Sequence, residues 1–125
     1  MANDRRPLIL DVDTGIDDSL AILYAAASPE AELVAVTALS GNVHVDDTER
    51  NTRAVVELAG CGDVEVVAGR PLPLLRPLDI TPDTHWPQGI GYATLPEPAR
   101  QRSGRFAPEV IVEEDSYIMP LPPSP

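Results

Sequence analysis

The chain has 125 residues, which suits one domain, or part of one, with a modest hydrophobic core. Its 9 basic and 20 acidic residues give a formal net charge of −11 at pH 7, which disfavours nucleic acids and anionic membranes as partners. One cysteine excludes an intramolecular disulfide, and the apolar run near the N-terminus is too short for a signal peptide or a membrane span. We therefore expect a cytoplasmic protein.

Apolar runs alternate with helical stripes in the first half of the chain. The expected strands are 7–10, 32–39 and 64–68, and the expected helices are 17–27 and a segment that begins at Asp46 or Asp47 and ends at Gly60. This alternation predicts an α/β fold with a Rossmann-like parallel sheet, flanking helices and right-handed crossovers.

Prolines dominate the second half of the chain. Seven of them lie between residues 71 and 98, where they break any long element and predict a functional or flexible loop. The segment 110–114 suits a helix or a strand, and the prolines of 119–125 predict an unstructured end. We expect a domain over residues 1–114 and a divergent, proline-rich tail over 115–125.

Four aspartates follow the first expected strand within one octet, Asp11-Val12-Asp13-Thr14-Gly15-Ile16-Asp17-Asp18. Carboxylates this close resist joint ionisation unless a cation lies among them. Oxygen ligands without nearby cysteine or histidine favour Ca²⁺ or Mg²⁺ over Zn²⁺. Ligands of parallel sheets bind beyond the carboxyl ends of the strands, so we expect the loops that begin at Asp11, Ser40 and Gly69 to converge.

The acidic octet has other interpretations. The acids could be solvated residues that only cap the following helix. An EF-hand is excluded, because Ile16 stands at the required glycine position and Ile22 at the required glutamate position. An aspartyl phosphatase of the haloacid dehalogenase type stays open, although that family usually has Gly-Thr where this chain has Thr14-Gly15.

The octet, preceded by Pro7-Leu8-Ile9-Leu10 and followed by an alanine-rich segment, resembles the N-terminal signature of the inosine-uridine-preferring nucleoside hydrolases. Further similarities follow in order at Gly41-Asn42-Val43, Asn51, Leu58-Ala59-Gly60, Ala68-Gly69, Pro71-Leu72, His85, Gly89-Ile90-Gly91 and Leu95-Pro96. The resemblance covers about residues 7–113. It implies the nucleoside hydrolase fold, hydrolysis of the N-glycosidic bond of ribonucleosides to ribose and free base, and a homodimer or homotetramer.

The resemblance also implies a role for individual residues. Asp13 would be the general base towards a calcium-bound water, Asp13 and Asp18 would bind Ca²⁺, Asp17 and Asn42 would bind ribose, His85 would lie near the base, and Asp11 would support the site. Trp86 stands where the family commonly has glycine, which leaves the base preference open.

The resemblance further implies that the chain is incomplete. Members of the family are much longer and draw further calcium, ribose and base contacts from their second half. We therefore expect a sheet that lacks strands and a truncated, inactive form of the enzyme. The alternatives are a non-catalytic remnant or metal-binding module and, less favoured, the aspartyl phosphatase.

Overall fold

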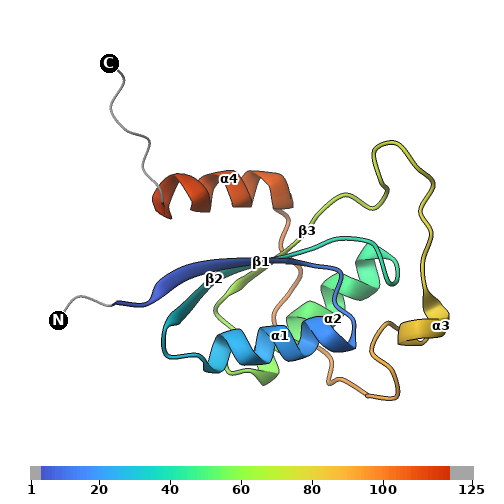
Figure 1. The fold of residues 1–125 in the computed structure, drawn as a ribbon, viewed down its shortest axis with the longest axis horizontal. Helices are drawn as coiled ribbons and strands as arrows, with labels where there is room; N and C mark the ends of the chain where they lie inside the picture. Colours follow the sequence, from blue (N-terminus) through green and yellow to red (C-terminus); the bar gives the residue numbers. More distant parts are fainter. Residues whose placement is uncertain (1–3, 119–125) are drawn as a thin grey trace.

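Figure 1 shows the chain as a computed structural model that describes residues 4–118, with side chains described as far as residue 114. Its strands are β1 (Arg6–Val12), β2 (Ala31–Ala38) and β3 (Glu65–Ala68), and its helices are α1 (Ile16–Ala27), α2 (Val45–Leu58), α3 (Pro82–His85) and α4 (Ala107–Ile118). Strands and helices alternate up to β3, and the long segment between β3 and α4 holds only the short α3.

The three strands form one parallel sheet in the order β1-β2-β3. At the carboxyl edge of this sheet Val12 pairs with Ala38, and Ala38 pairs with Ala68. Because these last paired residues lie in one row, the loops that follow the three strands begin side by side. The predicted parallel sheet is therefore confirmed, and its carboxyl edge is the place where the loops can meet.

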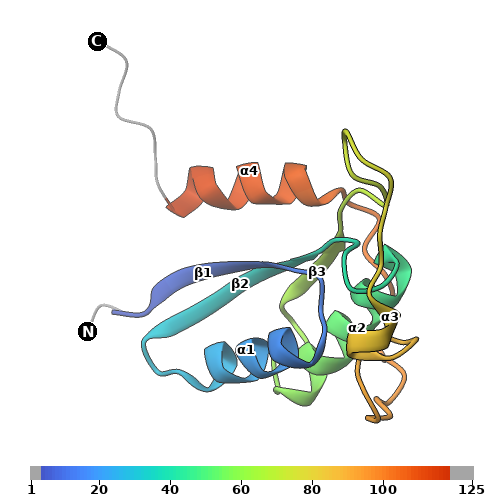
Figure 2. The same ribbon diagram turned by 45° about the vertical axis from the view of Figure 1, so that its right-hand side comes forward.

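Helices cover both faces of the sheet (Figures 1 and 2). The α1 and α2 helices pack together on one face, whereas α4 packs on β2 and β3 from the other. The larger core cluster contains Val12, Ile22, Leu33, Val36, Val55, Val56 and Val66, and the smaller cluster under α4 contains Ala35, Val67, Ala107 and Val110. The Rossmann-like α/β architecture is confirmed. No helix within residues 4–118 is long and apolar enough to cross a membrane.

The first strand is longer than predicted. It continues to Val12, so that Asp11 belongs to the sheet and not to the loop after it. The reason is a contact distant in sequence, since the backbone N–H of Leu39 donates to the carbonyl of Val12 at 2.9 Å. The β2 strand lies one residue earlier than predicted at both ends, and β3 begins one residue later than predicted.

Two helices also differ from the predictions. The α2 helix begins at Val45 and not at Asp46 or Asp47, because the His44 carbonyl already accepts the backbone N–H of Thr48 at 3.1 Å. The ambiguous segment 110–114 is helical and belongs to α4, which continues to Ile118 across the expected boundary after residue 114. The tail residues 119–125 lie outside the described part of the chain.

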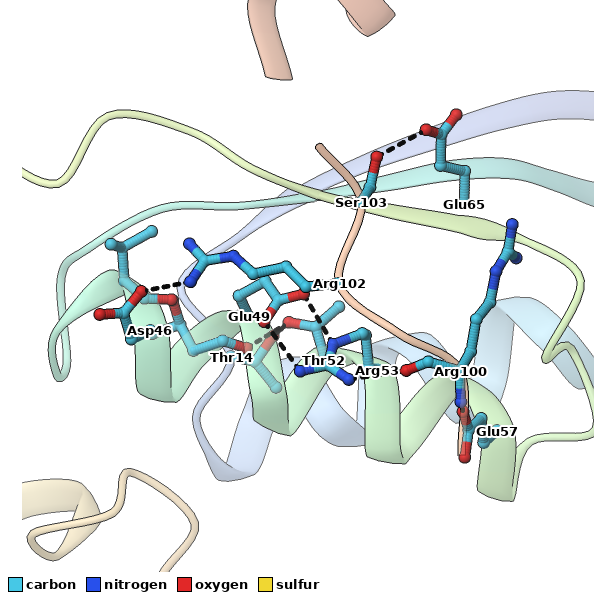
Figure 3. A network of polar contacts seen from close by, with 12 residues as sticks. Thr14, Asp46, Glu49, Thr52, Arg53, Glu57, Glu65, Arg100, Arg102 and Ser103 are labelled. Carbon is cyan, nitrogen blue, oxygen red and sulfur yellow. Dashed lines mark hydrogen bonds and ion pairs between the residues drawn. The ribbon is translucent and has the colours of Figure 1, made fainter. Parts of the chain in front are cut away.

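A network of polar contacts fixes the proline-rich segment on α2 (Figure 3). The Glu57 carboxylate accepts the backbone N–H groups of Ala99 and Arg100, each at 2.9 Å. Arg53 donates to the Arg100 carbonyl at 2.8 Å and forms a two-point ion pair with Glu49 at 2.7 and 3.2 Å. Glu49 is almost fully buried, with a side-chain exposure of 1%. These contacts hold the segment before α4 against α2.

We expect Arg53→Met to lower the free energy of unfolding by about 3 kcal/mol, because it leaves the buried Glu49 carboxylate without its partner. The matched control is Arg102→Met, which removes an ion pair to Asp46 whose side chains are 46% and 76% exposed. That loss should stay within about 1 kcal/mol. Urea unfolding of both variants measures the difference, and equal losses would contradict a dominant role for burial.

Candidate functional site

Asp13 and Asn42 connect the loops that follow β1 and β2. The backbone N–H of Asn42 donates to Oδ2 of Asp13 at 2.9 Å, and the Asn42 side-chain Nδ2 donates to the backbone carbonyl of Asp13 at 3.0 Å. Two hydrogen bonds between the same two residues restrict both rotation of the carboxylate and separation of the loops. The residue expected to act as general base is thus held in one orientation by the residue expected to bind ribose.

Asp18, in the first turn of α1, places its carboxyl group against that of Asp13. Burial, the hydrogen bond with Asp13 and the negative charges of Asp13 and Asp17 together raise the pKa of Asp18 to about 6, and burial is the largest of these causes. The N-cap of α1 is Gly15, so no aspartate of the octet caps this helix. Asp17 and Asp18 nevertheless lie in the first turn of α1, where negative charge favours a helix N-terminus.

His85 joins the same place from the segment that follows β3. The backbone N–H of Ile16 donates to its Nδ1 at 3.4 Å. A Cβ atom on Gly15 would stand 2.5 Å from that nitrogen and 2.8 Å from Nδ2 of Asn42, so only glycine lets both side chains approach here. Thr81 donates its backbone N–H to the Asn42 carbonyl at 2.9 Å. All three loops converge, as the topology predicts.

Gly41 has a role that the sequence did not reveal. A Cβ atom at this position would collide with the carboxylate of Asp13. Gly41 therefore forms the wall against which the Asp13 side chain rests, while the adjacent Asn42 holds it by hydrogen bonds. The only sequence signal for this contact is the Gly-Asn pair directly after a strand.

Buried threonines anchor the acidic octet to α2 (Figure 3). The Thr52 hydroxyl donates to the Thr48 carbonyl at 2.6 Å, so its oxygen accepts from the Thr14 hydroxyl, also at 2.6 Å. The Thr48 hydroxyl lies 2.8 Å from the carbonyl of Leu39, at the end of β2. Thr14, Thr48 and Thr52 are each fully buried. The sequence analysis missed this chain of contacts because Thr14 and Thr52 lie 38 residues apart.

The remaining two aspartates of the octet are Asp11, in β1, and Asp17, in α1. Asp11 Oδ1 accepts the Thr37 hydroxyl at 2.5 Å, a contact between β1 and β2. Asp17 is exposed in the first turn of α1, where its charge contributes to the raised pKa of Asp18. The expected roles of Asp11 as support and of Asp17 as a ribose ligand stay predictions.

Asp13 and Asp18 together offer a partial metal site. Within the described residues, no group of three or more histidine, cysteine, aspartate or glutamate side chains could hold a metal ion. The two carboxylates suit a hard cation, which would relieve their repulsion, but Ca²⁺ takes six to eight oxygen ligands. The arrangement therefore fits half of a calcium site that needs oxygen donors from elsewhere.

Trp86 stands at a backbone conformation that side chains rarely adopt. Its φ is 65° and its ψ is 165°, a region that favours glycine. The Trp86 ring packs against Tyr92 with ring centroids 4.6 Å apart. The chain thus places an aromatic pair directly after His85 at the cost of local backbone strain.

We expect Asp18→Asn to raise the melting temperature at pH 7.5 when divalent cations are removed. The pKa of Asp18 is about 6 in the folded chain, against an ordinary value of 3.8, so this group lowers the stability of the fold as the pH rises from about 4 to about 6. The gain should shrink towards pH 4, where the carboxyl group of the native chain is protonated in the folded state. Circular dichroism at both pH values measures the change in melting temperature, with the exposed Asp63→Asn as control. A lower melting temperature of Asp18→Asn at pH 7.5 would contradict a raised pKa of Asp18.

Comparisons with known proteins agree with this arrangement. Residues 8–120 match the model of the inosine-uridine preferring nucleoside hydrolase family. The chain is 41% identical to uridine nucleosidase 1 of Arabidopsis thaliana over 108 residues, which cover 86% of this chain and 32% of that protein. It is 36% identical to the pyrimidine-specific ribonucleoside hydrolase RihA of Citrobacter koseri over 119 residues, which cover 95% of this chain and 36% of that protein.

A solved structure shows the same fold. The purine-preferring ribonucleoside hydrolase from Gardnerella vaginalis superposes with a TM-score of 0.82 and 34% sequence identity, covering 87% of this chain and 36% of that chain. The chain thus spans about a third of the length of these relatives. The family match over residues 8–120 and the shared fold lead to one conclusion: the chain belongs to the inosine-uridine preferring nucleoside hydrolase family.

Proposed function

We propose that this chain carries the metal-binding and ribose-binding loops of an enzyme that hydrolyses the N-glycosidic bond of ribonucleosides. The observation that carries the proposal is the contact between the Asp13 and Asp18 carboxyl groups beyond β1, in a chain of this family. Relatives named for uridine, pyrimidine and purine substrates share the ribonucleoside and differ in the base. We therefore propose ribonucleosides as the substrate class, without a preference for one base.

Asp13 is proposed as the general base. The Asp13 carboxylate takes a proton from water while the water oxygen bonds to the anomeric carbon. The N-glycosidic bond breaks, and its electron pair leaves with the nucleobase. The backbone N–H of Asn42 keeps the Asp13 carboxylate oriented during this transfer. Positive charge that develops on the sugar is stabilised by the nearby carboxylates, by analogy with other glycoside hydrolyses.

Asp13 and Asp18 are the residues that would hold Ca²⁺. A bound calcium ion would supply positive charge that orients the water and lowers its pKa. Asp17 and Asn42 are proposed to bind the ribose hydroxyls, His85 to lie near the base, and Asp11 to support the strand end through Thr37. A cytoplasmic location and a dimeric or tetrameric state stay predictions.

The alternatives have less support. In the aspartyl phosphatase, Asp11 would be the nucleophile, whereas here its Oδ1 accepts a short hydrogen bond from Thr37. The family match also favours nucleoside hydrolysis over phosphoryl transfer. A non-catalytic metal-binding module would use the same Asp13 and Asp18, so calcium binding alone does not separate it from the enzyme.

We expect weak calcium binding by the chain, with a Kd on the order of 10⁻³ M, because two carboxylates supply only part of the ligand set. Asp13→Ala and Asp18→Ala should abolish this binding, whereas the exposed Asp63→Asn should not change it. Isothermal titration calorimetry at pH 7.5 measures the affinity, and it should fall as the pH drops through about 6, where Asp18 is protonated. Binding that survives both alanine substitutions would place the ion elsewhere.

We expect no detectable turnover of a chromogenic riboside by the 125-residue chain alone, because its described residues hold no third ligating carboxylate. The assay compares the chain with and without millimolar Ca²⁺, and Asp13→Ala serves as the control. Calcium-dependent release of the chromophore that disappears in Asp13→Ala would show that this chain is sufficient for catalysis.

A further inference from the structure

The α2 helix presents a buried polar stripe to the three loops of the site. Thr48, Asn51 and Thr52 stand at i, i+3 and i+4, so they share one face of the helix, and each is at most 2% exposed. Thr48 contacts the end of β2 through the Leu39 carbonyl, and Thr52 contacts the acidic octet through Thr14. The third member of the stripe, Asn51, contacts the loop that follows α3.

This last loop, residues 85–91, is here called the histidine loop. Nδ2 of Asn51 donates to the backbone carbonyl of Gln88 in the middle of the loop, at 2.7 Å. The two ends of the loop are joined as well, since the backbone N–H of Gly91 donates to the carbonyl of His85 at 2.9 Å. Because the loop is closed on itself, the Asn51 hydrogen bond ties the loop as a whole to α2.

Gly89 lets the histidine loop approach α2 closely. Its φ is 80°, and a Cβ atom there would stand 2.8 Å from the Val43 side chain and 3.4 Å from Nδ2 of Asn51. The next residue, Ile90, is only 7% exposed and buries its side chain in the protein. Apolar burial has no direction, whereas a hydrogen bond has one. The Asn51 hydrogen bond therefore fixes how the loop is oriented on the helix.

The orientation of the histidine loop determines which nitrogen of His85 carries the proton. The backbone N–H of Ile16 donates to Nδ1 of His85 at 3.4 Å, so the neutral imidazole carries its proton on Nε2. The other end of the loop also touches Ile16, because a Cβ atom on Gly91 would stand 3.1 Å from the Ile16 Cδ1 atom. Both ends of the loop are thus set against the start of α1.

We propose that Asn51 is a positioning residue for the nucleobase end of the site. By fixing the histidine loop on α2, it holds His85 against Ile16 and so keeps Nε2–H as a hydrogen-bond donor. Purines and pyrimidines both carry carbonyl or ring-nitrogen acceptors that such a donor can bind. Asn51 is almost fully buried, so it acts through the loop. This role rests on the proposed function, in which His85 lies near the base.

The test uses the full chain, labelled with ¹⁵N, and compares Asn51→Leu with Arg50→Met. Leucine has a similar size but donates no hydrogen bond, so exchange of the Ile16 amide should become about tenfold faster. The His85 Nδ1 signal should move towards that of an imidazole without a donor. Amide exchange within α2 should stay unchanged, which separates positioning from a general loss of stability.

Arg50→Met is the matched control on the same helix. Arg50 is the neighbour of Asn51 and forms an ion pair with Glu97, whose side chain is 81% exposed. Loss of this exposed pair should leave the signals of Ile16 and His85 as they are in the native chain.

Gly89→Ala tests the same arrangement from the loop and leaves α2 native. The added methyl group collides with Val43, so the loop should lift away from Asn51. The same two changes at Ile16 and His85 should follow, even if Asn51→Leu does not fold. Native signals at Ile16 and His85 in either variant, once folded, would overturn the positioning role.

Uridine, added at millimolar concentration with Ca²⁺, gives a separate readout for the proposed function. It should shift the His85 Nε2 signal of the native chain and leave that of Asn51→Leu unchanged. Equal shifts in both chains would overturn the positioning role. If both variants displace His85 while uridine leaves the native signal unchanged, the hold of Asn51 on the loop is supported and the proposed place of His85 near the base is wrong.

Discussion

The contact between the carboxyl groups of Asp13 and Asp18 is the constraint on which the rest of the site depends. Two carboxylates at this separation cannot both ionise without an energetic penalty, and the raised pKa of Asp18 reflects that penalty. The fold prevents the pair from relaxing, because the end of β1 fixes one carboxylate and the first turn of α1 fixes the other. At neutral pH the pair therefore favours any partner that supplies positive charge.

Neutral groups surround the Asp13–Asp18 pair and hold it in place. Asn42 holds the Asp13 carboxylate by hydrogen bonds, Gly41 supports it sterically, and the Thr14 hydroxyl ties the loop to α2. None of these groups neutralises the negative charge of the Asp13–Asp18 pair, so the repulsion between the two carboxyl groups remains for a positively charged ligand to relieve. Because the supporting contacts reach into the buried core, rearranging the loop would disrupt the packing of α2.

The sequence predicts those features that depend on neighbouring residues and misses those that depend on distant contacts. Apolar runs and helical stripes are local, so the existence and order of the three strands and of α1 and α2 were predicted correctly, whereas α4 was left open between helix and strand. The end of β1 depends on Leu39, and the threonine contacts join residues 38 positions apart. Likewise, the acidic octet stands out in the sequence, whereas the support from Gly41 becomes visible only when β1 and β2 are paired.

The incomplete site and the open side of the fold belong to the same strand. β1 ends beside Asp13 at its carboxyl end and presents its free edge along its length. A parallel strand paired there would end in the same row, so its following loop would begin next to the carboxylate pair. A cation held by oxygen atoms from both loops would bind more tightly than one held by Asp13 and Asp18 alone.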